Sequence, residues 1–120
     1  MHFDVERTTV AGRPALTVRG ELDLATAPRL ADAAHDLLGG GPAGIVVDLT
    51  PTVFLDSSGA RTLIAIARRA AAVGAELHVI APRANRPVRL PIDLLELGTV
   101  VPIVNSAGEV PSPAVNRDAT

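Results

Sequence analysis

One segment, residues 45–73, constrains the fold of this 120-residue chain more than any other. It begins with an apolar, β-branched run over residues 45–49, which carries one acid, Asp48, and predicts a strand covered on both faces. From Ala60 onward, apolar residues recur at helical spacing until Gly74, which can close the helix in a left-handed conformation. The segment therefore predicts a strand, a tight turn and a helix in close succession.

The turn between this strand and helix holds four short residues, Asp56, Ser57, Ser58 and Gly59. Such residues cap helix N-termini by accepting hydrogen bonds from free backbone N–H groups. The positive end of the helix dipole tolerates added negative charge, so a phosphate on Ser58 need not break the fold. A partner docked over that hydroxyl would tolerate the phosphate poorly. From these four residues alone, a helix cap without further role is the simpler interpretation.

Composition excludes several classes of function. The chain has no cysteine, and its 11 basic residues are all arginine, so mechanisms that need a disulfide, a thiolate or a lysine are excluded. A net charge of −2 argues against a broad electrostatic hold on nucleic acid. His2, His35 and His78 lack metal-ligand spacing. We therefore predict no catalytic residue, no metal and no cofactor.

The sequence also predicts where the protein works. Its first residues have neither the basic leader nor the apolar core of a signal peptide. No apolar run approaches the roughly 20 residues needed to cross a bilayer. We expect a cytoplasmic protein that contacts neither membrane nor nucleic acid directly.

Before the central segment, the sequence predicts a hairpin and a helix. Residues 3–9 and 15–20 alternate with a period of two around a turn at residues 11–14, which predicts two antiparallel strands. A helix follows, with Thr26 as its N-cap and Pro28 in its first turn. Three glycines end this helix.

After the central helix, residues 76–81 predict a strand parallel to the central one. Prolines weaken the pattern beyond it, and we predict a short helix over residues 91–97 and a last strand over residues 100–104. The whole chain is then an α/β protein with a mixed sheet of about 4–5 strands and helices packed mainly on one face. Residues 1–107 form the domain, and residues 108–120 form a flexible tail.

Two segments in this element order carry a resemblance to a known family. Gly20-Glu21-Leu22-Asp23 precedes the first helix, and Phe54-Leu55-Asp56-Ser57-Ser58-Gly59 precedes the second. Over residues 5–104 the chain resembles the STAS domain family, and within it the bacterial anti-sigma factor antagonists. The resemblance implies a partner-switching protein and no enzyme.

The resemblance assigns roles to particular residues. Unphosphorylated antagonists of this family bind an anti-sigma factor that is also an ATP-binding serine kinase, and so release a sigma factor. The kinase phosphorylates the serine before the glycine, here Ser58, with Ser57 as second choice, and a serine phosphatase resets the switch. The free protein is expected to be monomeric or weakly dimeric. Partner contacts are expected from Glu21, Asp23, Asp56, Ser57, Gly59 and Arg61.

Arg61 stands where the family often has a second glycine. One turn beyond Ser58, its guanidinium would reach a phosphate or a partner carboxylate. The alternative is an exposed arginine without a role, because single surface charges contribute little.

Three alternative functions share some of these features. A serine hydrolase is disfavoured because Asp56 replaces the first glycine of Gly-x-Ser-x-Gly. A receiver domain with Asp48 as phosphoacceptor would need a lysine. A STAS scaffold in a stress-signalling complex, or an accessory subunit of a lipid transport system, keeps the fold without a phosphoswitch.

Overall fold

The predicted hairpin forms one edge of the sheet. The computed structural model describes residues 2–112 of the chain. β1 (Asp4–Val10) pairs antiparallel with β2 (Arg13–Leu22), and the chain reverses through Ala11 and Gly12, both with positive φ angles. Glycine adopts such an angle without steric cost, which suits it to this turn.

Beyond the hairpin the strands run parallel. β2 pairs with β3 (Gly44–Asp48), β3 with β5 (Glu76–Ile80), and β5 with β6 (Ile103–Val104). The strand order is β1-β2-β3-β5-β6. The apolar run of the sequence is β3, and its residues 44–47 are buried, as the prediction of a doubly covered strand requires.

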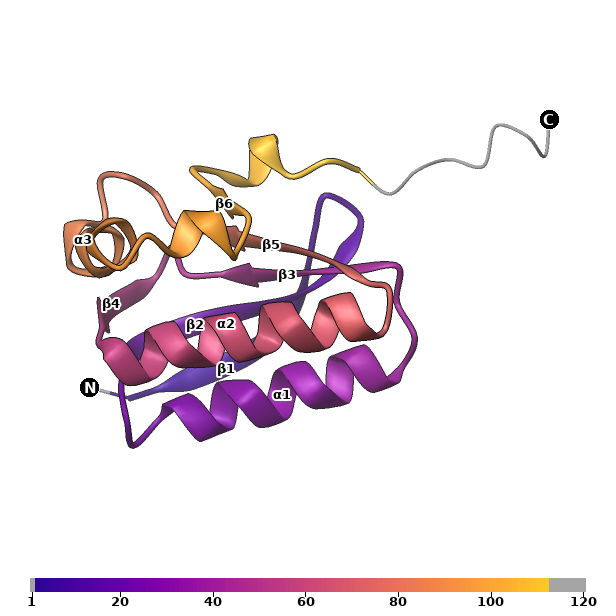
Figure 1. Ribbon diagram of the computed structural model, residues 1–120, viewed down its shortest axis with the longest axis horizontal. Coiled ribbons are helices and arrows are strands. Elements are labelled where there is room, and N and C mark those ends of the chain that lie inside the picture. Colours follow the sequence, from indigo (N-terminus) through magenta and orange to yellow (C-terminus); the bar gives the residue numbers. More distant parts are fainter. Residues whose placement is uncertain (1, 113–120) are drawn as a thin grey trace, which may run out of the picture.

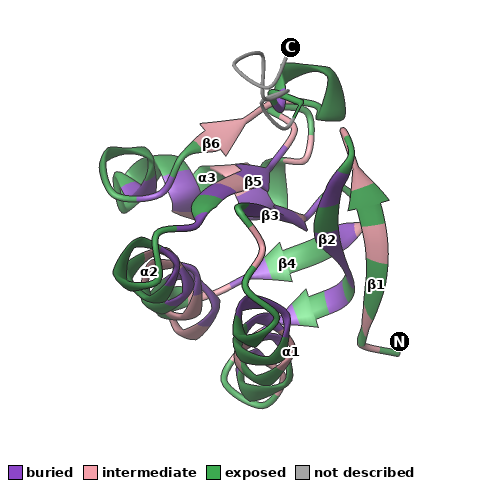
Figure 2. Cartoon of the chain, turned by 90° about the vertical axis from the view of Figure 1, so that its right-hand side faces the viewer, coloured by how far each residue is buried: buried purple, intermediate pink, exposed green. Residues whose placement is uncertain are grey.

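Two helices cover one face of this sheet (Figure 1). α1 (Ala27–Gly39) and α2 (Ser57–Ala72) lie side by side, and Figure 2 shows that each turns its buried side toward the strands. Burying an aliphatic side chain contributes about 1.5–3 kcal/mol relative to exposure, so these two stripes supply much of the core. The larger buried residues of the two helices are Leu30, Leu37, Leu38, Leu63 and Ile66.

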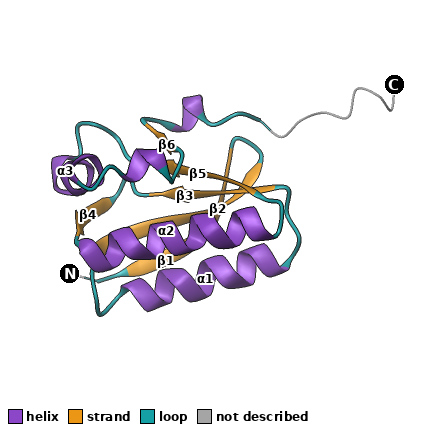
Figure 3. Cartoon of the chain, viewed as in Figure 1, coloured by secondary structure: helices purple, strands orange, loops and turns teal. Residues whose placement is uncertain are grey.

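A sixth strand was not predicted. β4 (Thr52–Leu55) pairs in parallel with the end of β2, with a register shift between Gly20 and Glu21 (Figure 3). Its four residues are buried only at the two ends, which is not the alternation of a half-buried strand. The strand forms because its backbone pairs with the end of β2. The local sequence does not predict that pairing.

The third helix begins earlier than predicted. α3 spans Arg86–Leu94 instead of residues 91–97, with Pro87 in its first turn and Pro91 inside it. A proline in the first turn removes no helical hydrogen bond, and burial of Val88 and Ile92 holds the helix together past Pro91. The helix ends where it does because Glu96, with φ of 53°, is left-handed.

The last predicted strand is shorter than expected. η1 (Leu97–Thr99), a turn of 3₁₀ helix, occupies the approach to residues 100–104, and only Ile103 and Val104 pair with β5. Pro102 has no N–H to donate, but its carbonyl accepts a hydrogen bond from the Val79 N–H at 2.8 Å. The proline therefore marks the start of the strand.

The residues after β6 cover part of the second face of the sheet. η2 (Ala107–Glu109) leads to Val110, which is buried with Ala15, Val46 and Ile80. The Arg13 side chain donates one hydrogen bond to the Pro111 carbonyl at 2.8 Å and one to Glu76 at 2.9 Å. The start of the predicted tail thus packs on the domain, while residues 113–120 lie outside the described residues.

Over residues 2–112, no helix is both long enough and apolar enough to span a membrane.

Candidate functional site

The site begins with the cap of α2. Asp56 is extended, with φ of −108° and ψ of −172°, and its Oδ1 accepts a hydrogen bond from the Gly59 N–H at 3.0 Å. Of the four residues predicted to cap the helix, Asp56 is the one that does so. The helix therefore begins earlier than the helical pattern that starts at Ala60, and Ser57 and Ser58 are its first two residues. Both serines therefore lie where the helix dipole favours negative charge.

Ser58 is partly exposed, and Ser57 is exposed. Within residues 2–112, neither hydroxyl makes a hydrogen bond. Ser58 lines a shallow hollow of about 330 Å³ between the first turns of α1 and α2, together with Leu24 and Arg61. The Ser58 side chain thus borders solvent and is not enclosed by neighbouring atoms.

Gly59 allows this end of α2 to lie close to β2. A Cβ atom on Gly59 would come within 2.8 Å of the Leu22 carbonyl oxygen and 2.5 Å of the Leu55 Cδ1. The Asp56 N–H also donates to the same Leu22 carbonyl at 3.2 Å. The structure thereby brings together residues 20–23 and 54–59, the two segments that carry the family resemblance.

Asp23 shapes the loop before α1. Its Oδ1 accepts hydrogen bonds from the backbone N–H groups of Ala25 at 3.0 Å and Thr26 at 3.1 Å. Thr26 holds the predicted N-cap position but makes no cap hydrogen bond, and its hydroxyl donates to the Glu21 carbonyl at 2.7 Å. Thr26 is thus the N-cap residue as predicted, but its hydroxyl closes the loop back onto β2 instead of capping the helix.

The other predicted residues lie around this turn. Glu21 is exposed at the end of β2, opposite Phe54 of β4. Arg61 is exposed on α2 and, within the described residues, forms no ion pair. Arg61 shares the hollow with Ser58, Asp56 caps the same helix, and Glu21 and Asp23 lie on the neighbouring segment at the end of β2.

Exposed apolar side chains border the same turn, which the sequence did not reveal. Leu24, in the loop before α1, is 77% exposed, and Phe54 on β4 is 44% exposed. Isolated exposed apolar residues are common, but aromatic and aliphatic residues beside a polar turn are typical of interface centres. In the sequence, Leu24 is a large apolar residue between Asp23 and Thr26, and this placement was the available signal for an exposed apolar side chain.

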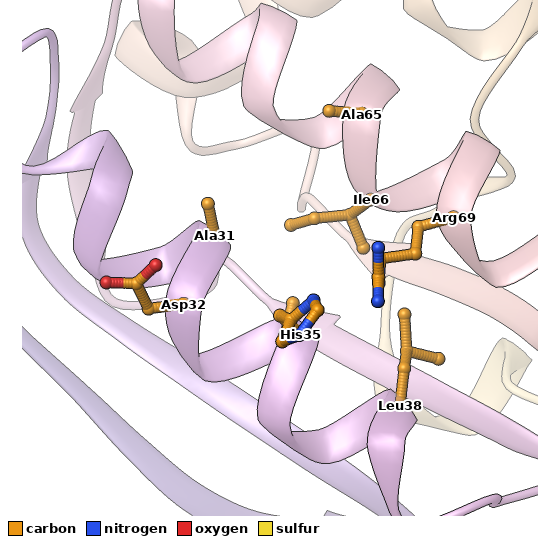
Figure 4. Close-up of a pocket in the computed structure, with 8 residues that line it drawn as sticks. Ala31, Asp32, His35, Leu38, Ala65, Ile66 and Arg69 are labelled. Carbon is orange, nitrogen blue, oxygen red and sulfur yellow. The ribbon is translucent and has the colours of Figure 1, made fainter.

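A second hollow, of about 380 Å³, lies between α1 and α2 and does not include Ser58. Figure 4 shows Ile66 and Arg69 of α2 facing His35 and Leu38 of α1 across it. The hollow exists because small alanine side chains leave space between the two helices. Its floor is apolar. Asp32 and Arg69 carry opposite charges, so the hollow has no net charge to select an ionic ligand.

His78 lies outside the site, on β5. Its Nδ1 is buried and has no hydrogen-bond partner. Burial, and then the nearby charge of Arg13, lower the pKa of His78, while Glu76 opposes them. Within residues 2–112, no group of three or more His, Cys, Asp or Glu could hold a metal ion.

Comparison with known proteins identifies relatives of this fold. A family model described as Mlab, STAS domain, matches residues 6–102. No curated protein sequence matches the chain. Among solved structures, an anti-sigma factor antagonist from Mycobacterium paratuberculosis is 24% identical, with a TM-score of 0.74 over 88% of this chain and 87% of that chain.

Two solved structures of SpoIIAA, in its unphosphorylated and phosphorylated forms, are also similar to this chain. The anti-sigma factor antagonist SpoIIAA in its unphosphorylated form is 20% identical, with a TM-score of 0.65 over 98% of this chain and 92% of that chain. The Bacillus protein in its phosphorylated form is 19% identical, with a TM-score of 0.59 over 98% of this chain and 96% of that chain. At these identities the likeness establishes the fold.

Proposed function

The chain belongs to the STAS domain family, and from this premise we propose that it is an anti-sigma factor antagonist controlled by phosphorylation of Ser58. The observation that carries the proposal is the position of Ser58. It is partly exposed at the capped N-terminus of α2, in a hollow that Leu24 and Arg61 also line. A kinase can reach a side chain there, and a partner that covers the hollow would meet it directly.

Two of the similar proteins are described as anti-sigma factor antagonists, and one of these, SpoIIAA, was also solved in a phosphorylated form. These descriptions belong to those proteins. They support the proposal because the present chain shares their fold and presents a serine at the start of α2.

Electrostatics explains how the modification would act. A phosphate adds about −1.5 to −2 charges at neutral pH to a surface that already holds Glu21, Asp23 and Asp56. A partner surface packed on Ser58 would have to desolvate this dianion, and each loss of about 1.4 kcal/mol weakens binding tenfold. The switch would therefore be local. Arg61 is the candidate counter-ion, because it lines the same hollow.

The partners follow from this mechanism. The proposed binding partner is an anti-sigma factor with ATP-dependent serine kinase activity, which occupies the surface around Ser58 and Leu24. A serine phosphatase restores the unmodified state. The proposed role is binding without catalysis, in the cytoplasm. In this role Ser58 is the phosphoacceptor, and Ser57 contributes to the contact with the partner.

The test uses three single variants and the serine kinases of the same genome. We expect Ser58→Ala to abolish incorporation of phosphate from ATP while retaining kinase binding, and Ser58→Asp to weaken binding at least tenfold. For phosphate incorporation, Ser57→Ala is the matched control, since it removes a neighbouring hydroxyl and leaves the acceptor. Phosphate mapped to Ser57, or equal kinase affinity of Ser58→Ala and Ser58→Asp, would contradict the proposal.

A second candidate function has one observation in its favour. The matching family model carries the description Mlab and not that of an antagonist. The chain would then be a scaffold, or an accessory subunit of a lipid transport system, that uses the same surface without phosphorylation. Affinity purification separates the two: an ATP-binding serine kinase supports the antagonist, and an ATPase subunit of a transporter supports the accessory role.

A further inference from the structure

We propose that a hollow beside α3, formed by Arg83, Arg86 and Arg89, binds the phosphate group of a small phosphate monoester. The hollow measures about 220 Å³, and Leu90 and Asp93 complete its lining. It shares no residue with the hollow that holds Ser58. This inference goes beyond the proposed function and does not depend on a phosphoswitch.

The charge of the hollow fits such a group. Of its three arginines, only Arg89 is paired, by a hydrogen bond from its Nε to Asp93 Oδ1 at 3.0 Å. Within residues 2–112, Arg83 and Arg86 form no ion pair. Two positive charges thus remain uncompensated, which complements the charge of about −1.5 to −2 on a phosphate monoester. Guanidinium groups bind phosphate oxygens in pairs, with directional hydrogen bonds.

The loop that carries these arginines is held in place by side-chain hydrogen bonds. The Arg83 N–H donates to Asn105 Oδ1 at 2.7 Å, and Arg89 Nη1 donates to the Ala81 carbonyl at 2.8 Å. The Asn85 amide donates to the Thr52 carbonyl at 2.7 Å and reaches two further carbonyls of the preceding turn. The backbone between β5 and α3 is therefore ordered before a ligand arrives, which lowers the entropic cost of binding.

The position in the fold suits a ligand site. The loop follows the carboxyl end of β5, a central parallel strand, and leads into a helix. In open α/β sheets, ligands bind outside the carboxyl ends of the strands at a switch point of the strand order, and this loop shares that edge of the sheet but not a switch point. Leu90 is 51% exposed beside the arginines, so the organic part of an ester has an apolar surface to lie against.

The test is an NMR titration of the intact chain with phenyl phosphate, in a buffer free of other phosphate and at constant ionic strength. We expect saturable shifts of the amides over residues 83–90 at millimolar ligand, and competition by inorganic phosphate. The double variant Arg83→Gln/Arg86→Gln should bind at least tenfold more weakly. Arg68→Gln is the matched control, because Arg68 is an exposed arginine on α2 and does not line the hollow.

Three results would overturn the proposal. The first is the absence of saturable shifts at these residues with the unmodified chain. The second is equal weakening by Arg68→Gln and the double variant, which would indicate a general attraction of anions. The third is benzoate binding as tightly as phenyl phosphate, because a carboxylate carries less charge on the same ring. Unchanged amide spectra of the double variant away from α3 show that it folds.

Discussion

Replacing Gly59 with alanine tests how closely α2 must approach the end of β2. The new methyl group would come within 2.5 Å of Leu55 Cδ1, 2.8 Å of the Leu22 carbonyl oxygen and 3.0 Å of Leu22 Cγ. Leu22 and Leu55 are at most 1% exposed, so neither can move away without disturbing the core. Overpacking of this kind costs about 1–3 kcal/mol.

A second contribution to the free energy of unfolding has the opposite sign. Alanine in a helix is about 1 kcal/mol more favourable than glycine, so the substitution also stabilises α2. The two contributions leave a net loss of up to about 2 kcal/mol of unfolding free energy, and the upper part of this range is expected because the carbonyl oxygen at 2.8 Å belongs to the backbone and cannot rotate away.

Gly39→Ala is the matched control, because Gly39 is also helical and a Cβ there meets nothing within 4 Å. This variant should be as stable as the unmodified chain or gain up to about 1 kcal/mol. Urea unfolding of both variants, with equal m-values, gives the difference directly. If Gly59→Ala is at least as stable as Gly39→Ala, the close approach of α2 to β2 is refuted.

Two further predictions concern the sheet and the loop before α3. The lowered pKa of His78 means that the unfolded chain takes up a proton that the folded chain resists, so stability falls as pH drops below about 6.5. His78→Gln should reduce the change in urea midpoint between about pH 7.5 and pH 5.5, and an unchanged difference would assign the pH dependence elsewhere. Asn85→Ala should lower the free energy of unfolding by about 1–3 kcal/mol, because its amide bridges three carbonyls. Asn105→Ala, which removes one acceptor, should cost less, and the reverse order in urea unfolding would contradict this account.

Much of the fold was predictable because its signals are local. The hairpin follows from alternation around Ala11 and Gly12, and the capped start of α2 follows from the side chain of Asp56. The same locality predicted the candidate site, since Ser57 and Ser58 come directly after the cap. The roles of these serines stay predictions until phosphorylation is measured.

Other features were not predictable because their causes are distant in the sequence. β4 pairs with the end of β2, some 30 residues earlier, and Thr52 donates its hydroxyl hydrogen to the Val18 carbonyl at 2.6 Å. The early start of α3 depends on burial of Val88 and Ile92, which outweighs the cost of Pro91. The packing of Val110 likewise needs the second face of the sheet to exist first.

The sequence by itself determined the hairpin, the order of the two long helices and the strands beside them, and the capped turn with its two serines, because a capping side chain and its N–H groups are neighbours in the chain. Only the tertiary structure decided what surrounds them. Leu24 and Arg61 share a hollow with Ser58, and three arginines near α3 line another, because the sheet and helices place these residues together. Burial and backbone pairing between distant segments determine those positions, so a local sequence pattern cannot predict them.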